Sequence, residues 1–545
     1  MRLFLSLFTL FLVSLSSCTH KDEPTKLVLL STADVHGHIY PWNYYADEAD
    51  ERHSLLKAAT LIDSVRSQQP HTLVFDAGDW LQGNPFAEYF ARTDTTQPFA
   101  FIGVTQAMNF DGIVVGNHEF NFGLPHLHYR ISESDVPFMA ANAVDYETGE
   151  PAYTPWLLQE KDGFSIGIIG LTTPGSAVWD RPRLEGRIRF EDGAKTAARY
   201  VTKLQEKGAE VIVIVMHAGF EGTTSYTSDE LGEEHFGQTI AETVPGVHAI
   251  IASHTHRVID DLTYFSEANP QGVAVTQPGR WASHLGYTEL LLSRDSEGNA
   301  IVNFGLNRAL PVEAAEPHPE LYARYLSQHE RVRAHVQAPI ARTDSVWTST
   351  RARLEDSPIT DLVQYVQRKA TGADLSGSAI FNTDATFADG VITRGNLARL
   401  YPFENTLFKL RISGAELREY LEFSARYFAT YEGDGSEAPV SSGVTPGFNF
   451  DVVYGASYQI DVRQPAGDRI RNLEVNGRPV QDSDHFTIAL NSYRAVGGGD
   501  FHMIANAEVV KKIDTSVRLL IEAYLLEKGH INPQDVARNY WELVY

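Results

Sequence analysis

Residues 113–123 read IVVGNHEFNFG, a short β-branched run followed at once by Gly116, Asn117, His118 and Glu119. Runs of this kind are typical of buried strands in parallel sheets. Ligands of open α/β sheets bind at the carboxyl ends of the strands, so we expect these polar side chains at such an edge. Four further runs have the same form: LVLLS (27–31) before Asp34 and His36, TLVFD (72–76) before Asp79, EVIVIV (210–215) before His217, and AII (249–251) before His254 and His256.

These residues form a mixed set of imidazole, carboxylate and amide donors, which suits Zn, Mn, Fe or a similar divalent ion. One metal has too few coordination positions for seven ligands, whereas two metals that share a carboxylate would use them all. Asp-x-His and His-x-His place both side chains on one side if the segment is extended. Five other histidines are expected to be structural: His38, His126, His128, His248 and His284.

Charge and composition exclude several classes of protein. The chain has 545 residues, is 43% hydrophobic, and carries 45 Lys and Arg against 70 Asp and Glu, a net charge of −25. Such a chain repels a polymeric nucleic acid, although a small anion can bind where metals reverse the local field. Cys18 is the single cysteine, which excludes disulfides within the chain and cysteine-rich zinc sites.

The pattern divides the chain into two unlike halves. Residues 27–315 alternate short apolar runs with helical periodicity, as at 55–68 and 191–207, which predicts an α/β domain. Residues 316–344 are predicted to form a linker with a polar, solvent-facing helix at 316–338. Residues 345–545 are predicted to form an α+β domain, with helices at 358–370, 415–427 and 513–527 and a loop at 430–447.

The N-terminus resembles that of a bacterial lipoprotein. Residues 1–17 contain one charge and an apolar run, and Leu15-Ser16-Ser17-Cys18 resembles a lipobox. We therefore expect a signal peptide at 1–17, a lipid anchor on Cys18 and a tether at 18–26. The expected location is the bacterial cell envelope, anchored in the outer membrane and facing the periplasm or the cell surface. The alternative is an ordinary cleaved signal peptide with an incidental cysteine.

The order of these motifs resembles the calcineurin-like metallophosphoesterases. GDWLQGNPFAEYF (78–90), GNHEFNFG (116–123) and YPFENTL (401–407) narrow the resemblance to the 5′-nucleotidase family, over nearly all of residues 27–510. Within that family, the chain is most similar to the branch that hydrolyses 2′,3′-cyclic nucleotides and 3′-nucleotides. The resemblance implies a four-layer α/β/β/α metallophosphoesterase domain, a linker helix and a C-terminal 5′-nucleotidase domain that rotates about a hinge near 335–345.

The resemblance also implies a role for each residue of the metal site. His118 would face the phosphoryl group without binding metal, and Asn121 stands where the 5′-nucleotidase branch has an Asp that orients this histidine. Ser253 stands where the family usually has Gly. The implied metals are two divalent ions (Mn, Zn, Co or Fe), the first held by Asp34, His36 and His256, the second by Asn117, His217 and His254, with Asp79 bridging them.

The second half would supply a nucleoside pocket. Aromatic side chains in Gly-containing loops can stack on a base, and we select Phe448 rather than Phe450 as the partner of Tyr493. Residues 383–387 lack the Arg found in 5′-nucleotidases, which argues against a strict 5′-monophosphate specialist. The substrate-binding residues implied by the resemblance are Asn382, Phe448, Tyr493 and Asp500.

Three functions remain open. The first is hydrolysis of 2′,3′-cyclic nucleotides and 3′-nucleotides to nucleoside and phosphate. The second keeps this chemistry with other substrates, as a 5′-nucleotidase or UDP-sugar hydrolase. The third is a surface lipoprotein that binds nucleotides without catalysis, against which the presence of all seven ligands counts. We expect a monomer.

Overall fold

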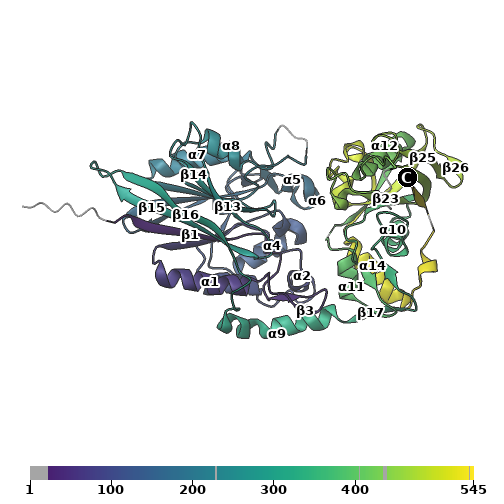
Figure 1. The fold of residues 1–545 in the computed structure, drawn as a ribbon, viewed down its shortest axis with the longest axis horizontal. Helices are drawn as coiled ribbons and strands as arrows, with labels where there is room; N and C mark the ends of the chain where they lie inside the picture. Colours follow the sequence, from purple (N-terminus) through teal and green to yellow (C-terminus); the bar gives the residue numbers. More distant parts are fainter. Residues whose placement is uncertain (1–22, 227–229, 404, 434–438, 539) are drawn as a thin grey trace, which may run out of the picture.

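The computed structural model describes residues 23–226, 230–403, 405–433, 439–538 and 540–545, which form two domains joined by a long helix (Figure 1). The predicted signal peptide (1–17), Cys18 and the start of the tether lie outside the described residues, as do Glu404 of YPFENTL and residues 434–438 of the predicted loop. Among the helices that the structure describes, none has the length and apolar character needed to span a membrane.

The first domain contains two six-stranded sheets. In the first sheet, β1, β4, β5 and β6 run parallel, and in the second β9, β11, β12 and β14 do. The strand order in the first sheet is β16 (Ala300–Pro311), β15 (His284–Arg294), β1 (Thr25–Thr32), β4 (Thr72–Asp76), β5 (Gly112–Val114) and β6 (Phe138–Met139). The strand order in the second sheet is β13 (Val258–Tyr264), β14 (Val273–Pro278), β12 (Ala249–Ile251), β11 (Val211–His217), β9 (Phe164–Thr172) and β8 (Trp156–Lys161).

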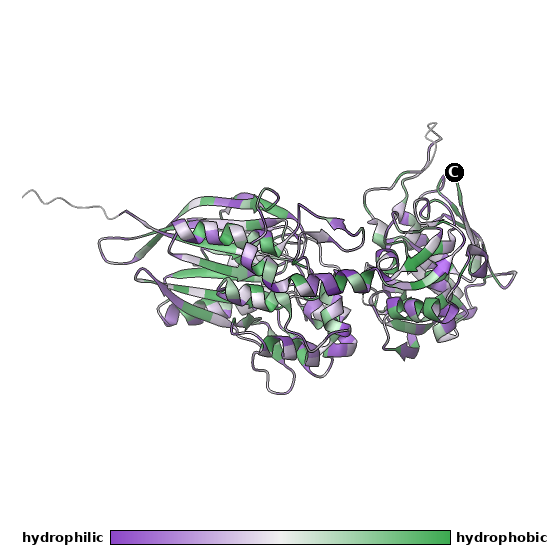
Figure 2. Ribbon diagram, turned by 90° about the horizontal axis from the view of Figure 1, so that it is seen from below, coloured by the Kyte–Doolittle hydropathy of each residue, from purple (hydrophilic) through white to green (hydrophobic). Residues whose placement is uncertain are grey.

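Side chains alternate between the two faces of each strand, so one hydrophobic core forms between the sheets and one on the outer face of each sheet. In β1, Leu27 and Leu29 pack between the two sheets, whereas Val28 and Leu30 pack against the helices outside. The helices α1 (Leu55–Gln68), α2 (Pro85–Arg92), α3 (Ala100–Ala107) and α4 (Leu124–Ser132) cover the first sheet, and α7 (Gly193–Glu206) and α8 (Gly237–Thr243) cover the second. Figure 2 shows the strands as largely hydrophobic and the covering helices as mixed. This confirms the predicted four-layer α/β/β/α architecture.

Local sequence explains where elements begin, and one feature was not predicted. The side chain of Ser54 caps α1 by accepting from the backbone amides of Leu56 and Lys57, so the helix begins at Leu55, as its periodicity predicts. The long antiparallel hairpin of β15 and β16 at the edge of the first sheet was not predicted. Its half-exposed strands carry few of the continuous apolar runs that mark buried strands.

The linker helix α9 (Pro319–Val336) is present and one of its faces is exposed, as predicted, but its other face is buried. Leu321, Tyr325 and Val332 are buried against the first domain. The hydroxyl of Tyr44 lies 2.7 Å from Nδ1 of His329. The helix runs along the lower edge of the first domain in Figure 1 and leads into β17 (Pro339–Thr343). The helix is amphipathic: its charged residues are exposed or partly exposed, and its buried apolar residues lie along one face.

The second domain is α+β, as predicted. A five-stranded sheet mixes parallel and antiparallel pairs and packs with helices, beside a four-stranded sheet. The strand order in the five-stranded sheet is β23 (Asp451–Tyr454), β19 (Leu375–Ala379), β27 (His485–Asn491), β22 (Leu407–Ser413) and β28 (Glu508–Ile513). The strand order in the four-stranded sheet is β26 (Arg478–Pro479), β25 (Ile470–Val475), β24 (Ala456–Asp461) and β29 (Trp541–Val544). The main helices are α10 (Pro358–Thr371), α11 (Arg394–Leu400), α12 (Gly414–Ser424) and α14 (Val517–Lys528).

Short elements complete the two domains. In the first they are β2 (Trp42–Asn43), β3 (Glu48–Ala49), β7 (Ala143–Asp145), β10 (Ile188–Phe190), α5 (Ser176–Trp179) and α6 (Arg181–Leu184). In the second they are β18 (Trp347–Thr348), β20 (Thr386–Phe387), β21 (Gly390–Thr393) and α13 (Ser492–Ala495). The domains touch through a buried ion pair, in which Arg518 of α14 lies 2.6 Å from Glu88 of α2.

Candidate metal centre

Five strands deliver their predicted side chains to one place. The turns after β1, β4, β5 and β12 and the last residue of β11 carry them, so both sheets contribute from their carboxyl ends. Donor atoms converge in overlapping groups: Asp34, His36 and His256; His36, Asp79 and His118; and Asp79, His217 and His254. Residues more than two hundred positions apart thus meet, as the sequence predicts.

In the first group, imidazole and carboxylate donors face one another. Nε2 of His36 lies 3.1 Å from Nε2 of His256, which lies 3.6 Å from Oδ1 of Asp34. Nδ1 of His36 lies 2.7 Å from the carbonyl of Gln82 and must donate to it, which leaves a lone pair on Nε2. That lone pair points into the group and can bind a cation.

The second group has the same character. Nε2 of His217 lies 3.0 Å from Oδ1 of Asn117 and 3.1 Å from Oδ2 of Asp79. Since Nδ1 of His217 lies 2.8 Å from the carbonyl of Ala77, the proton belongs on Nδ1 and three acceptors converge. Oδ2 of Asp79 is also 3.9 Å from Nε2 of His36, so it faces both groups. Converging acceptors of these types fit a pair of divalent cations.

The backbone that presents these groups is left-handed rather than extended. Asp34, His36, Asp79, His254 and His256 have φ of 49°, 46°, 62°, 68° and 59°. Non-glycine residues rarely adopt such angles, and the strain persists only where the surrounding structure enforces it. The expectation that Asp-x-His and His-x-His lie on extended segments is therefore wrong, because tight turns bring these side chains together.

Glu119, for which no role is predicted, holds two of these turns together. Its buried carboxylate accepts from the backbone amides of Asp79 (2.8 Å), Gly116 (2.6 Å), Trp80 (2.9 Å) and Leu81 (3.1 Å). A Cβ on Gly116 would lie 2.3 Å from Oδ1 of Asp79, so only glycine allows the turns to approach this closely.

Burial and mutual repulsion perturb the acidic groups. Burial raises the pKa of Asp34 well above its ordinary value, and the charge of Asp79 adds to this. Burial also acts to raise the pKa of Asp79, but His217 and His118 outweigh it and hold that pKa well below its usual range. Burial raises the pKa of Glu119 to about 8. Such a concentration of perturbed carboxyl groups is typical of a functional site.

His118 points at the same centre from the turn after β5. Its backbone amide donates to Oδ1 of Asp79 over 2.8 Å, and its Nε2 lies 4.0 Å from Oδ2 of Asp79. Its Nδ1 lies 2.6 Å from Oδ1 of Asn121, the other predicted catalytic residue. The structure thus brings both residues to the centre, with Asn121 behind the imidazole.

Contacts with surrounding residues hold the predicted ligands in place, and the sequence predicts none of these contacts. Nε2 of His254 lies 3.0 Å from Oε1 of Glu234, so its Nδ1 is the nitrogen left for metal. Trp179 stacks on the His254 ring with centroids 5.5 Å apart. Ser253 is buried, and its hydroxyl donates to the carbonyl of Ala77 over 2.9 Å, so a serine fits at this position.

The predicted base-binding residues come from two segments of the second domain: Phe448 lies in a single 3-10 turn at Gly447–Asn449, and Tyr493 lies in α13, which leads into a glycine-rich loop. Phe448 is 51% exposed, whereas Phe450 is 0% exposed and stacks on Tyr427, so Phe448 is the one available to a ligand. Burial raises the pKa of Tyr493, and the carboxylate of Glu234 adds to this across the domain boundary. Asp500 follows in the same glycine-rich loop and has a φ of 68°.

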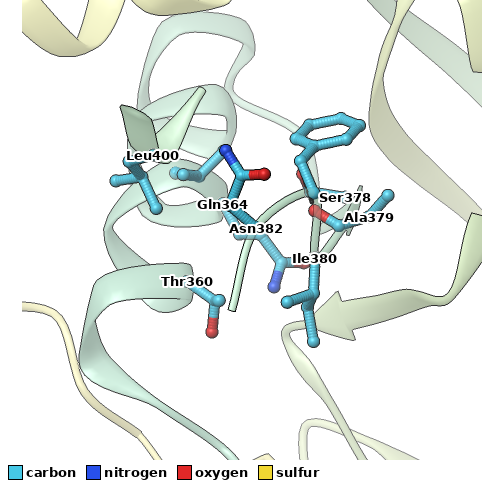
Figure 3. A pocket seen from close by; sticks show the side chains of 9 residues that line it. Thr360, Gln364, Ser378, Ala379, Ile380, Asn382 and Leu400 are labelled. Carbon is cyan, nitrogen blue, oxygen red and sulfur yellow. Dashed lines mark hydrogen bonds between the residues drawn. The ribbon is translucent and has the colours of Figure 1, made fainter. Parts of the chain in front are cut away.

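The side chain of Asn382 is held by a hydrogen bond within the second domain. Its amide nitrogen donates to the carbonyl of Arg399 over 2.6 Å. It lines a cavity of about 10 Å³ beside Thr360, Gln364 and Leu400 (Figure 3). A cavity of that size holds at most one water, so this cavity is not the nucleoside pocket, and the substrate role of Asn382 stays a prediction.

Comparisons with known proteins agree with this geometry. A family model of the calcineurin-like phosphoesterases matches residues 27–258, and one of the 5′-nucleotidase C-terminal domain matches residues 335–506. A 2′,3′-cyclic-nucleotide 2′-phosphodiesterase/3′-nucleotidase from Salmonella typhimurium is 31% identical over 98% of this chain and 91% of its own length. One from Haemophilus influenzae is 30% identical over 95% and 87%.

Solved structures give the same result. A crystal structure from Staphylococcus aureus, described as that of a 5′-nucleotidase with alpha-ketoglutarate, superposes with a TM-score of 0.81 at 26% identity, over 95% of this chain and all of the other. The identity to full-length relatives, the two matched domain models and the converging metal-binding groups lead to one conclusion. This chain belongs to the 5′-nucleotidase family of calcineurin-like metallophosphoesterases.

Proposed function

We propose that this protein hydrolyses 2′,3′-cyclic nucleotides to 3′-nucleotides, and 3′-nucleotides to nucleoside and phosphate. The observation that carries the proposal is the convergence of seven metal-binding side chains in a chain 31% identical to an enzyme named for these two activities. Asn121 supports this specificity over a 5′-nucleotidase, because that branch carries Asp at this position. The absence of Arg at 383–387 points the same way.

The donor set divides naturally between two cations, with Asp79 shared. Bound there, divalent metals would supply Lewis acidity that activates water and neutralises charge on the phosphoryl oxygens. The residues proposed for the first position are Asp34, His36 and His256, and for the second Asn117, His217 and His254. Mn, Zn, Co and Fe all accept such ligands.

His118 is proposed to act on the phosphoryl group itself. With its proton on Nδ1 held by Asn121, its Nε2 faces the centre 4.0 Å from Oδ2 of Asp79. A second proton on Nε2 would stabilise charge that develops on the phosphoryl oxygens or protonate the leaving oxygen. Phe448 and Tyr493 would hold the base, and Asp500 would accept from the ribose hydroxyls.

A side-by-side assay decides the substrate. Purified protein is stripped with a chelator, reloaded with Mn, Co or Zn, and assayed on 2′,3′-cyclic AMP, 3′-AMP and 5′-AMP. We expect turnover of the first two, loss with chelator and recovery with metal. Preference for 5′-AMP or a UDP-sugar would establish the alternative activity. Binding of nucleotides without turnover of any of them would contradict the proposal and indicate a non-catalytic lipoprotein.

We further propose that the protein is a monomer tethered to the cell envelope through a lipid on Cys18, with a signal peptide at 1–17 and a tether at 18–26. The lipobox-like segment supports this. Cys18→Ala should abolish palmitate labelling and release the protein from membranes. Labelling that persists in the variant would contradict the anchor. The domain limits 27–315, 316–344 and 345–545 remain part of the same proposal.

A further inference from the structure

A line of polar side chains extends behind His118 into the protein. Nδ1 of His118 lies 2.6 Å from Oδ1 of Asn121, and Nδ2 of Asn121 donates to Oδ2 of Asp180 over 2.8 Å. Oδ1 of Asp180 in turn accepts from Nη1 of Arg183 over 2.6 Å. His118 and Asn121 belong to the same turn after β5, whereas Asp180 lies at the junction of α5 and α6. Two independent segments therefore meet behind the imidazole.

The donors and acceptors in this line permit one arrangement. An ionised carboxylate only accepts hydrogen bonds, so Asp180 requires the amide nitrogen of Asn121 to face it. The amide oxygen must then face His118, where it accepts from Nδ1–H. In the neutral imidazole of His118, the lone pair then lies on Nε2, the atom that faces Asp79. A free asparagine could turn its amide either way and would not select this tautomer.

Asp180 is buried, and its contacts hold its carboxylate in one orientation. Its side chain is 4% exposed, and Arg183 balances its charge within the same short segment. It makes no side-chain cap to α6, so helix capping does not explain it. The preceding residue, Trp179, stacks on the ring of His254. This segment therefore contacts both a proposed metal ligand and the support of His118.

We propose that Asp180 is a positioning residue for phosphoester hydrolysis, which acts through Asn121 to set the tautomer and orientation of His118. The inference rests on the hydrolase function proposed above. The carboxylate of Asp180 does not contact the imidazole directly, because the amide of Asn121 lies between them. The Asp180 carboxylate fixes the direction of the Asn121 amide, and the amide oxygen in turn fixes the proton of His118 on Nδ1.

A charge swap tests the relay against a purely structural role. Asp180→Asn, Asn121→Asp and the double variant are compared with the unmodified metal-loaded protein. Turnover is measured on 3′-AMP and on phenyl phosphate, with melting temperature and metal content as controls. Phenyl phosphate reports phosphoester hydrolysis whichever nucleotide is preferred, so failure of the nucleotide assignment and failure of the relay are distinguishable.

Asp180→Asn should lower kcat by about 10-fold to 100-fold with little change in KM, as loss of an outer supporting group typically does. Asn121→Asp alone should also lower kcat, because it places two carboxylates in contact. The double variant restores one carboxylate and one amide, in exchanged positions, and should recover most of the activity. A structural role for Asp180 predicts that the two losses add instead.

Three results would overturn the inference: unchanged kcat in Asp180→Asn, unchanged or raised kcat in Asn121→Asp, or a double variant no faster than the slower single variant. If Asp180→Asn melts below the assay temperature, Asn121→Asp decides alone. Asn121→Asp keeps the size of the side chain, so its contact with the carboxylate of Asp180 is what makes it harmful.

Discussion

Glu234 offers a sharp test of the metal centre that does not depend on substrate. Its carboxylate lies 3.0 Å from Nε2 of His254 and accepts from the amide of Ser225 over 2.6 Å. Burial acts to raise the pKa of Glu234, but the hydrogen bond to His254 outweighs it and lowers that pKa. The carboxylate therefore fixes the proton of His254 on Nε2 and leaves the lone pair of Nδ1 available to a cation.

Glu234→Gln keeps the shape of the side chain and removes its charge. A glutamine can still accept from His254, but a charge-assisted hydrogen bond is about twice as strong as a neutral one. Loss of an outer carboxylate typically costs about 10-fold to 100-fold in metal affinity. At about 1.4 kcal/mol for each tenfold change, this corresponds to about 1.4–2.8 kcal/mol.

The dissociation constant for Zn²⁺ is measured by competition with a chromophoric chelator, so no turnover is needed. Glu233→Gln is the matched control, since Glu233 is exposed and its carboxylate accepts from the hydroxyl of Thr239. We expect weaker binding in Glu234→Gln and native binding in Glu233→Gln. Equal affinity in all three proteins would refute the assignment of His254 as a ligand oriented by Glu234.

Three further predictions concern catalysis, substrate and stability. His118→Asn should retain both metals by elemental analysis yet lower kcat by about 10²–10⁴, and a metal-free variant would contradict its role. Phe448→Ala should raise KM for 3′-AMP about tenfold or more and leave phenyl phosphate unaffected, because base stacking contributes about 1–3 kcal/mol; equal effects on both substrates would refute stacking. Burial and the charge of Asp356 raise the pKa of Asp361, so its stabilising proton is lost as pH rises through that pKa. The free energy of unfolding of Asp361→Asn, relative to that of the unmodified protein, should therefore rise between pH 5.5 and 8, as measured by urea unfolding. A difference between the two proteins that does not change with pH would exclude a raised pKa at Asp361.

The sequence predicts the fold well where periodicity is strong. The run at 72–76 is the strand β4, and the periodic segment 55–68 is the helix α1. Burial on both faces leaves a continuous apolar run, and a capped amphipathic helix leaves a clear period. The hairpin of β15 and β16 leaves neither signal, because one face of each strand is partly exposed.

The sequence also predicts which side chains meet, but not how. The position of Asp34 and His36 after a strand is enough to place them at the sheet edge. Their left-handed backbone cannot be derived from residue type, since only contacts such as those of Glu119 and Gly116 enforce it. Supports such as Asp180 arrive from distant segments without a motif, so only tertiary structure reveals them.

The contact between the domains limits how the second domain can move. The carbonyl of Gln82 accepts from the metal-site residue His36, while its side-chain amide donates to the carbonyl of Pro402 in the second domain over 3.4 Å. Nearby, Glu88 and Arg518 form a buried ion pair across the same boundary. A motion that carries the second domain away from the first would separate this pair, because each domain holds one partner. Exposing both charges to water together offsets much of the cost that removing one partner inside the protein would incur. The pair therefore favours the observed arrangement of the domains without locking it, which suits a site whose predicted base-binding and metal-binding residues lie on different domains.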